Sequence, residues 1–257
     1  MRCTIIGLGE AGRIYAEALQ ARGHDVLGYD VAPIPTPNLR RAASMAEAVG
    51  EADAVIVMTT ARASLPVARD AATHLAPGTL YADFTSAAPQ AKLALNEVLP
   101  AWVLPADIAI LGPVISLGTS TPLMAAGPGA ERVAELLRPV GAPVEVVHGE
   151  LGDAMAHKLL RSIVMKGLAA VVCEAVEAGR RAGYEDWVRG QIAAELSGDG
   201  QSTIDRFITG SAKHAARRAD EMAAVVDYCE ALGAPSNMSS AARDSLLTLA
   251  EGALKSA

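Results

Sequence analysis

The chain has 257 residues, of which 51% are hydrophobic and 20% charged, which is enough apolar sequence for two modest domains with their own cores. This composition excludes a disordered chain. The formal net charge of −7 argues against non-specific binding to nucleic acid or to an anionic membrane. Every apolar run is too short for a membrane span, and three scattered cysteines suit a reducing compartment, so we expect a cytoplasmic protein.

The first 31 residues read as a strand, a glycine-rich turn, a helix and a second strand. The predicted elements are Arg2–Ile6, the GLGEAG turn, Glu10–Arg22 and Asp25–Tyr29. Gly7 allows a tight turn out of the strand, Gly9 lets a phosphate approach the backbone, and Gly12 lets the helix pack closely. The free amides at the helix start carry partial positive charge. The spacing predicts a dinucleotide site with contacts from Gly7, Leu8, Gly9, Glu10, Ala11 and Gly12.

An acidic residue, Asp30, directly follows the second strand. Its carboxylate would accept hydrogen bonds from the adenosine ribose and repel a 2′-phosphate, so the expected cofactor is NAD or NADP, with NAD favoured. The alternative for the whole segment is that the glycines only form a tight turn between a strand and a helix.

Up to residue 148, short apolar runs alternate with amphipathic stretches, which is typical of βα units that build a parallel sheet. Ser44, with Glu47 three residues later, predicts a capped helix. We therefore expect an α/β, Rossmann-type doubly wound, mostly parallel sheet over residues 1–148. The further strands are predicted at Ala54–Met58, Thr79–Ala82, Ala101–Ala106, Pro122–Ala126 and Pro143–Val147.

From residue 149 to 257 the strand signals stop and helical periods take over, which predicts an all-α substrate and dimerisation domain. A ligand crevice is expected between the two domains. The helices are predicted at Gly152–Arg181, Asp186–Leu196, Ser202–Ile208, Ser211–Leu232 and Ser239–Leu254.

Polar side chains follow the third, fourth and fifth predicted strands, where ligands of doubly wound folds bind. We expect Thr59, Thr60 and Thr85 to contact the cofactor. Their neighbours Ser86, Asp107 and Gly112 are expected to contact a small polar substrate. The alternative for each loop is ordinary turn chemistry, in which Asp, Ser and Thr bond to local backbone groups.

Lys158, Ser162 and Lys166 lie one turn apart on the arc of the long helix opposite its apolar face. Hydride transfer to a carbonyl needs a proton donor within hydrogen-bond reach, and either lysine is a candidate for that catalytic role beside Ser162 as a substrate contact. The alternative is that both lysines lie on a solvated face.

His214, Arg217, Arg218 and Glu221 share one face of a later helix. His214 and Arg217 are candidate contacts for a substrate anion, whereas the alternative is an internal Arg–Glu network or a subunit contact. The histidines show no metal-ligand spacing, so no metal site is expected.

Four stretches carry a family resemblance: IIGLGEAG (Ile5–Gly12), DFTSAAP (Asp83–Pro89), ADIAILGP (Ala106–Pro113) and GDAMAHKLLRS (Gly152–Ser162). On these, the chain resembles the β-hydroxyacid dehydrogenase and 6-phosphogluconate dehydrogenase superfamily over its full length. The resemblance implies an NAD(P)-dependent oxidoreductase acting on a small polar hydroxy or carbonyl compound. It places Lys158 where the family has its catalytic lysine, and it implies a homodimer formed through the helical domain.

The sequence departs from the family pattern at several positions. Thr85 and Ser86 are in reversed order, Ser162 replaces an asparagine, and Leu111 replaces the serine of the substrate loop. The changes at Ser162 and Leu111 imply a substrate other than a typical short 3-hydroxyacid. The short helical domain and two stretches, KLLRSIVMKG (Lys158–Gly167) and HAARRADEM (His214–Met222), resemble a little-characterised branch of the superfamily. Two alternatives stay open: an enzyme like the imine reductases, and a non-catalytic dinucleotide sensor.

Overall fold

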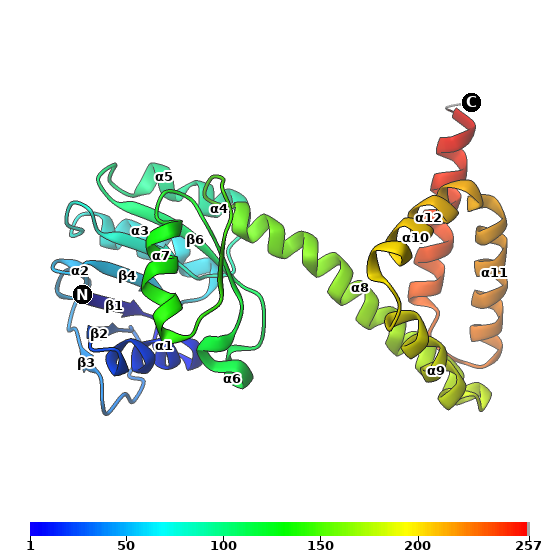
Figure 1. Cartoon of the computed structure of the whole chain (residues 1–257), viewed down its shortest axis with the longest axis horizontal. Coiled ribbons are helices and arrows are strands. Elements are labelled where there is room, and N and C mark those ends of the chain that lie inside the picture. The colour runs from blue at the N-terminus through cyan, green and yellow to red at the C-terminus, as the bar shows by residue number, and fades with distance from the viewer. Residues whose placement is uncertain (256–257) are drawn as a thin grey trace. The chain divides into compact units, whose positions relative to one another are not determined.

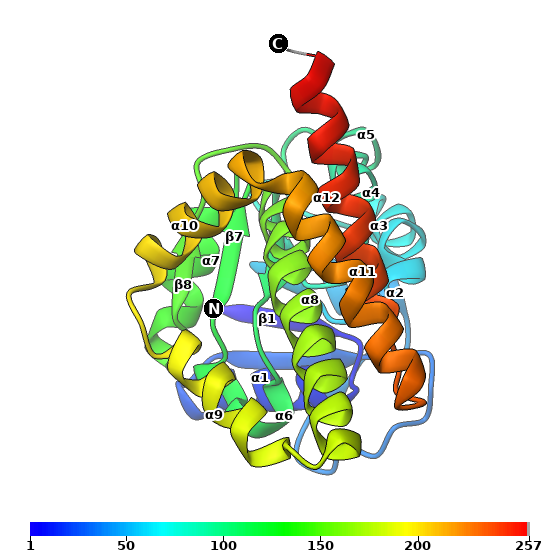
Figure 2. The same ribbon diagram turned by 90° about the vertical axis from the view of Figure 1, so that its right-hand side faces the viewer.

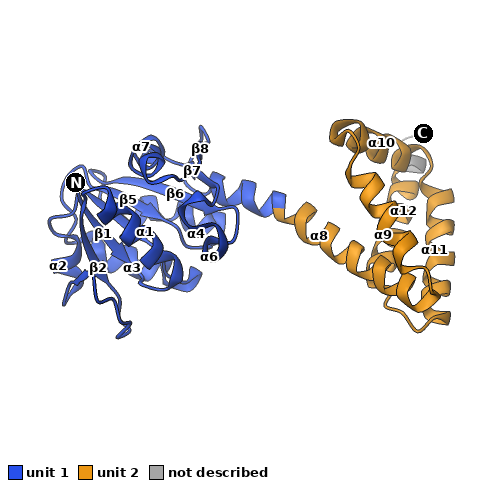
Figure 3. Ribbon diagram, turned by 60° about the horizontal axis from the view of Figure 1, so that its bottom comes forward, with its two compact units in different colours: residues 1–161 blue, residues 162–257 orange. Residues whose placement is uncertain are grey.

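The structure is a computed structural model that describes residues 1–255, and the side chains of residues 1–252. It consists of two compact units that divide after Arg161, within one long helix (Figure 3). The predicted domain boundary after residue 148 therefore falls before the helix, whereas the compact units divide inside it. Within the described residues, each helix is too short or too polar to cross a membrane.

The first unit contains a sheet with helices around it (Figure 1). Its strand order among the described residues is β3-β2-β1-β4-β5-β6-β7-β8. Neighbouring strands are parallel except for β6 and β7. This confirms the predicted α/β class. The strands are β1 (Arg2–Ile6), β2 (Asp25–Tyr29), β3 (Arg40–Arg41), β4 (Ala54–Val57), β5 (Leu80–Asp83), β6 (Leu104–Ile110), β7 (Leu123–Ala126) and β8 (Val144–Val146).

Helices cover both faces of this sheet, and its central strand β4 is apolar and buried at every position. In β4, Ile56 packs into the core beneath α1 and α7, while Val55 and Val57 pack into the core beneath α2, α3 and α5. The helices of this unit are α1 (Glu10–Ala21), α2 (Met45–Val49), α3 (Ser64–Ala72), α4 (Pro89–Leu93), α5 (Leu95–Val98), α6 (Val114–Leu117) and α7 (Ala130–Leu137).

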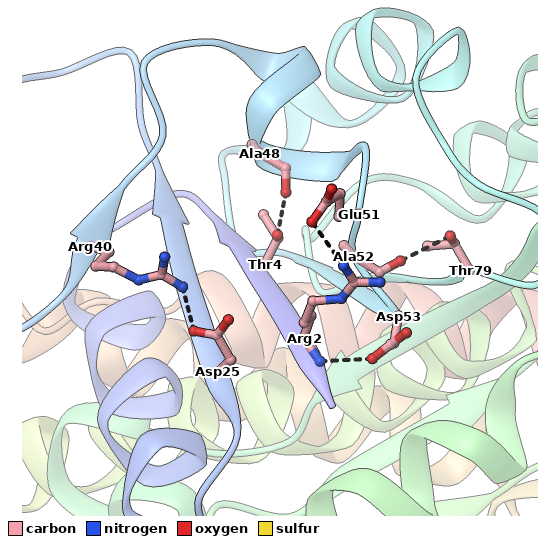
Figure 4. Close-up of polar contacts among 9 residues, drawn as sticks. All are labelled: Arg2, Thr4, Asp25, Arg40, Ala48, Glu51, Ala52, Asp53 and Thr79. Atoms are coloured by element: carbon pink, nitrogen blue, oxygen red, sulfur yellow. Dashed lines mark hydrogen bonds and ion pairs between the residues drawn. The ribbon is translucent and has the colours of Figure 1, made fainter.

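The predicted cap of α2 is confirmed. The amide of Glu47 donates to the hydroxyl of Ser44 over 3.2 Å, and the Glu47 carboxylate accepts from the amide of Ala43 over 2.8 Å. The sheet edge next to this helix carries exposed ion pairs, from Arg2 to Glu51 and from Arg40 to Asp25 (Figure 4). These pairs lie at the amino ends of the strands, away from the carboxyl ends where a ligand is expected.

The second unit is all-helical, as predicted. Its helices α11 and α12 pack side by side (Figure 2). Glu174 of α8 reaches the start of α12, where its carboxylate accepts from the amides of Met238 (2.7 Å) and Ser239 (2.8 Å). The helices are α8 (Asp153–Ala182), which begins in the first unit, α9 (Glu185–Leu196), α10 (Gly200–Lys213), α11 (Ala215–Ala231) and α12 (Asn237–Lys255).

Two predicted boundaries are wrong. The fifth predicted strand, Ala101–Ala106, is β6 at Leu104–Ile110, so Asp107 lies inside a strand and not in the loop after it. The predicted helix break near residues 209 and 210 is absent from the described chain, because α10 continues to Lys213. Gly210 lies inside α10, where its missing side chain makes room for Arg218, whose Nη2 would lie 2.7 Å from a Cβ at this position.

The carboxylate of Glu174 links the stability of the second unit to pH. Burial alone raises its pKa, but hydrogen bonds from the Ser239 hydroxyl and the Met238 and Ser239 amides outweigh burial and lower the pKa below its usual 4.5. Because the pKa is lower in the folded state, this stabilisation is present above pH 4.5 and is lost as the pH falls through the folded-state pKa.

We predict that Glu174→Gln lowers the free energy of unfolding by roughly 1–3 kcal/mol at pH 7, since the hydrogen bonds lose a charged acceptor. Thermal unfolding from pH 7 to 3 would measure this, with Glu230→Gln, an exposed carboxylate of α11, as control. The difference from the wild type should shrink at acid pH. A constant difference across this range would contradict the account.

Candidate functional site

The turn from β1 to α1 depends on three glycines with different roles. Gly7 has a positive φ of 95°, and a Cβ there would lie 2.5 Å from the carbonyl oxygen of Met58. At Gly12 a Cβ would lie 1.9 Å from the carbonyl oxygen of Gly7, which forbids any side chain. At Gly9 a Cβ would meet no described atom within 4 Å. Gly7 and Gly12 are thus required by the turn itself, whereas Gly9 leaves open space in front of α1.

The amino end of α1 is available to an anion. Gly9 is its N-cap residue, and among the described residues no side chain caps the first turn. The first amides of a helix, here starting at Glu10 and Ala11, have no partner inside the helix and carry partial positive charge. The amide of Leu8 is not among them, because it donates to the carboxylate of Asp30 over 2.7 Å.

A cleft of about 700 Å³ opens beside this turn, entirely within the first unit. Apolar side chains such as Ile34, Met58 and Val67 form much of its wall, which suits a flat aromatic base. Its lining includes seven of the predicted cofactor residues: Gly7, Gly9, Glu10, Ala11, Asp30, Thr59 and Thr60.

The loop after β2 forms one wall of the cleft and is held by Arg41. The guanidinium donates to the carbonyl oxygens of Asp30 (2.8 Å), Ala32 (2.9 Å) and Ile34 (2.6 Å). The second oxygen of the Asp30 carboxylate accepts from the amide of Ala32 over 2.8 Å. Arg41 therefore fixes the backbone around Asp30 through carbonyl oxygens, and the Asp30 carboxylate stays next to the glycine turn.

Two buried threonine hydroxyls lie at the carboxyl ends of β4 and β5, where the sequence predicted cofactor contacts. Among the described residues, Thr59 Oγ1 and Thr85 Oγ1 have no hydrogen-bond partner. A buried hydroxyl without a partner is unfavourable unless a ligand satisfies it. Together with the open space at Gly9 and the uncapped helix, these hydroxyls fit a bound dinucleotide.

Lys158, in the second turn of α8, is paired with the loop after β5. Its ammonium nitrogen lies 3.2 Å from the hydroxyl oxygen of Ser86, to which it donates a hydrogen bond. Ser86 is exposed and Lys158 is half-buried, so a ligand can reach both. The structure thus brings together two of the predicted site residues from positions 72 apart in the chain.

Two tyrosines of the first unit are poor proton donors. Burial raises the pKa of Tyr15 to about 12. Burial, and then the nearby carboxylate of Asp83, raises the pKa of Tyr81 well above its usual value. Both tyrosine side chains are fully buried, so a ligand reaches neither of them, whereas Lys158 is half-buried.

A buried charged cluster lies behind this pair and was not found from the sequence. Lys92 of α4 is fully buried, and its ammonium lies 3.4 Å from the carboxylate of Asp83 and 3.1 Å from that of Asp107. The two aspartates are neighbours in register on β5 and β6. In the sequence, Lys92 is a single lysine in a short helical stretch, Pro89–Leu93, and nothing in that stretch indicates that the lysine is buried.

This cluster changes the role that we assign to Asp107. Its carboxylate is fully buried and accepts from the amide of Met155 over 2.9 Å, so it does not face a ligand. Asp107 was predicted to contact the substrate, whereas in the structure its carboxylate holds the start of α8 through the amide of Met155. The reason is the register of β6, which places residue 107 inside the sheet. Gly112 lies beyond the end of this strand, where a Cβ would come within 3.3 Å of Thr121.

The remaining predicted site residues belong to the second unit. Ser162 is half-buried, and Lys166 and His214 are exposed. Arg217 forms an ion pair with Glu221, which is the Arg–Glu contact that the sequence left as an alternative. The parts that these residues play in a site stay predictions.

The helical part of the chain is similar to a family that has no assigned role. Residues 180–248 match a domain of unknown function, DUF1932. A 28.5 kDa uncharacterised protein of Methanothermus fervidus is 25% identical over 183 residues, which are 70% of this chain and 69% of that protein.

The similar solved structures include two that cover nearly the whole chain. One is a conserved protein of unknown function, described as structurally similar to 3-hydroxyacid dehydrogenases, at 26% identity and a TM-score of 0.66 over 100% of both chains. The other is an imine reductase from Aspergillus terreus, at 16% identity and a TM-score of 0.79 over 98% of this chain and 94% of that one. At 16% identity the second likeness concerns the fold alone.

Residues 2–149 match the NAD binding domain of 6-phosphogluconate dehydrogenase. This match contains the glycine turn, the cleft, Ser86 and the buried cluster, and it supports an NAD(P)-dependent oxidoreductase. Because it covers more than half of the chain, the protein belongs to the 6-phosphogluconate dehydrogenase family of NAD-binding proteins, as its sequence motifs predicted.

Proposed function

We propose that this protein transfers a hydride between a nicotinamide dinucleotide and a small polar hydroxy or carbonyl compound, with Lys158 as the acid and base. The observation that carries the proposal is the contact of 3.2 Å between the Lys158 ammonium and the Ser86 hydroxyl. Both residues lie in the same unit as the glycine turn. Ser86 follows β5 and is next in sequence to Thr85, whose hydroxyl has no hydrogen-bond partner in the described part of the chain.

The cofactor would be held by the cleft and the turn. The amides of Glu10 and Ala11 and the space at Gly9 would receive the pyrophosphate, and Asp30 would accept from the adenosine ribose. Thr59, Thr60 and Thr85 would bond to the polar groups of the nicotinamide half. When bound, the nicotinamide supplies or accepts the hydride.

The chain's own contribution to the chemistry is proton transfer and orientation. An ammonium has three donors and no acceptor, so Lys158 can bond to Ser86 and still donate to a substrate oxygen. In the reducing direction it would hand a proton to that oxygen as the carbon is reduced, and in the oxidising direction it would take the proton back. Ser86 would orient both the ammonium and the substrate oxygen.

Mutation of two glycines separates cofactor binding from folding. Gly9→Ala meets no described atom in the protein, so it should leave the melting temperature within about 2 °C of wild type but weaken dinucleotide binding at least about tenfold, because its methyl group occupies phosphate space. Gly12→Ala collides with the turn and should lower both stability and affinity. Thermal unfolding and calorimetric titration measure the two effects. Unchanged binding by Gly9→Ala would place the dinucleotide elsewhere.

Lys158→Met should lower turnover by about 10²–10⁴-fold and leave the dinucleotide affinity nearly unchanged, because it removes the proton donor but no cofactor contact. Lys166→Met is the matched control and should cost less. The assay requires a screen of small hydroxyacids, sugar acids, aldehydes and cyclic imines with both cofactors. The imines test the alternative of an imine reductase. Full activity in Lys158→Met, with loss in Lys166→Met or His214→Ala, would overturn the assignment.

We further propose that NAD is preferred over NADP, because the Asp30 carboxylate would repel a 2′-phosphate and Arg41 is bonded to backbone carbonyl oxygens. NAD should bind more tightly than NADP, and Asp30→Asn should narrow the difference. Competitive titration of both cofactors against wild type and variant measures this. NADP binding more than about tenfold tighter than NAD to the wild type, about 1.4 kcal/mol, would refute the role of Asp30.

Finally, we propose a homodimer in which α8 contacts a second copy of the chain. Between residues 159 and 171 this helix exposes a run of large apolar side chains, and each of them is at least 40% accessible. An exposed apolar stripe of this length is unfavourable in water unless another surface covers it. The side chains are Leu159, Leu160, Ile163, Val164, Met165, Leu168 and Val171.

Ile163→Glu, at a position 70% exposed in the single chain, should convert the dimer into a monomer, because a carboxylate would be buried at the contact. Light scattering across micromolar concentrations measures the mass. Val31→Glu, 91% exposed in the first unit, is the control and should not change the mass. A monomeric wild type would remove the proposal.

A further inference from the structure

The buried ammonium of Lys92 has contacts that reach both members of the proposed catalytic pair. It donates to the carbonyl oxygen of Asp83 over 2.6 Å and faces the carboxylates of Asp83 and Asp107. Each of the two carboxylates also accepts a hydrogen bond from a backbone amide in a different part of the site. These groups, called here the Lys92 cluster, consist of Lys92, Asp83 and Asp107.

One branch of the cluster leads to the loop that carries Ser86. The carboxylate of Asp83 accepts from the amide of Thr85 over 2.8 Å, and its other oxygen accepts from the hydroxyl of Ser64 in α3. Thr85 is the residue directly before Ser86. The backbone of the loop is therefore held to the cluster one residue away from the hydroxyl that receives the hydrogen bond of Lys158.

The other branch leads to the helix that carries Lys158. The carboxylate of Asp107 accepts from the amide of Met155, in the first turn of α8, over 2.9 Å. Met155 precedes Lys158 by about one helical turn. The contact from Lys158 to Ser86 closes the ring, so both partners of the 3.2 Å hydrogen bond are fixed to one ammonium.

Stability alone gives little reason for this arrangement. Burying charged groups carries a large desolvation cost, and well-packed apolar residues in their place are often neutral or stabilising. Lys92 and both carboxylates have almost no exposed surface. What the cluster provides that an apolar core cannot is a set of directed hydrogen bonds to the amides of Thr85 and Met155.

We infer that Lys92 is a positioning residue: through Asp83 and Asp107 it sets the distance between Ser86 and Lys158 and so the protonation behaviour of Lys158. This inference rests on the proposed role of Lys158. The ionisation of an ammonium depends on the groups within hydrogen-bond reach, so loss of the cluster would change the pH at which Lys158 reacts.

The test measures the reactivity of Lys158 directly. Wild type and Lys92→Met are treated with an amine-acylating reagent from pH 6 to 11, and labelling of each lysine is followed by peptide mass spectrometry. We expect the midpoint of the Lys158 profile to shift in Lys92→Met, while that of Lys213, an exposed lysine in the same sample, stays fixed. Turnover should fall at least about tenfold, with dinucleotide affinity within about twofold of wild type.

Two further variants separate positioning from general destabilisation. Leu137→Ala removes a fully buried side chain of α7 outside the cluster, and it should lower the melting temperature without moving the Lys158 profile. Asp107→Asn keeps an acceptor for the Met155 amide but removes the charge facing Lys92. Asp107→Asn alone should shift the Lys158 labelling profile. It serves as the test variant if Lys92→Met does not fold.

A Lys158 profile that is the same in wild type, Lys92→Met and Asp107→Asn would overturn the inference and leave the cluster a purely structural role. The Lys158 profile could shift in Lys92→Met while the wild type turns over no compound of the screen. That result would support the positioning role of Lys92 and refute the proposed function. The labelling readout needs no substrate, so the two failures are distinguishable.

Discussion

The structure depends on one interaction above the others: the buried ammonium of Lys92 between the carboxylates of Asp83 and Asp107. Parallel pairing of β5 and β6 sets the two aspartates side by side, and two adjacent buried carboxylates would repel each other without a cation. The same carboxylates hold the amides of Thr85 and Met155. The carboxylates that need Lys92 as a counter-charge in the sheet therefore also fix the backbone of the loop after β5 and of the start of α8.

The glycine turn imposes a second constraint, and it is independent of the first. The surrounding backbone leaves no room for a side chain at Gly7 or Gly12, whereas the space beside Gly9 is open among the described residues. The Asp30 carboxylate ties the turn to the end of β2 through the amide of Leu8. The first unit therefore has a cleft beside a turn that backbone contacts determine, and at the carboxyl end of β5 a loop in which Ser86 accepts a hydrogen bond from Lys158.

The sequence predicted the parts of the fold that local pattern determines. Strands β1 and β2 and the extent of α8 agree closely with the structure, since apolar periodicity and glycine spacing mark them. The sequence analysis failed where the structure at one position depends on a residue far away in the chain. The predicted gap between residues 208 and 211 lies inside α10, where Arg218 occupies the space beside Gly210. The burial of Lys92 depends on the register of β5 and β6, which no local pattern in the sequence shows.

The same distinction applies to the candidate site. The glycine turn itself could be predicted, because the positive φ of Gly7 and the close approach of Gly12 to Gly7 are local in sequence, and its cofactor contacts stay a prediction. Asp107 was predicted in the loop after the fifth strand, whereas it lies inside β6, because that strand begins and ends later than predicted. The partnership of Lys158 with Ser86 joins residues from a strand end and a helix, and no spacing rule connects them.

A crystal structure with bound oxidised dinucleotide would test the central claim that Lys158 serves the reacting centre. A substrate oxygen must lie about 3 Å from the donor, and the reacting carbon about 3–3.5 Å from the nicotinamide C4. The account therefore predicts that Lys158 Nζ lies within about 6 Å of C4, beside Ser86. A nicotinamide ring more than about 10 Å from Lys158, with Lys166 or His214 next to C4, would contradict it.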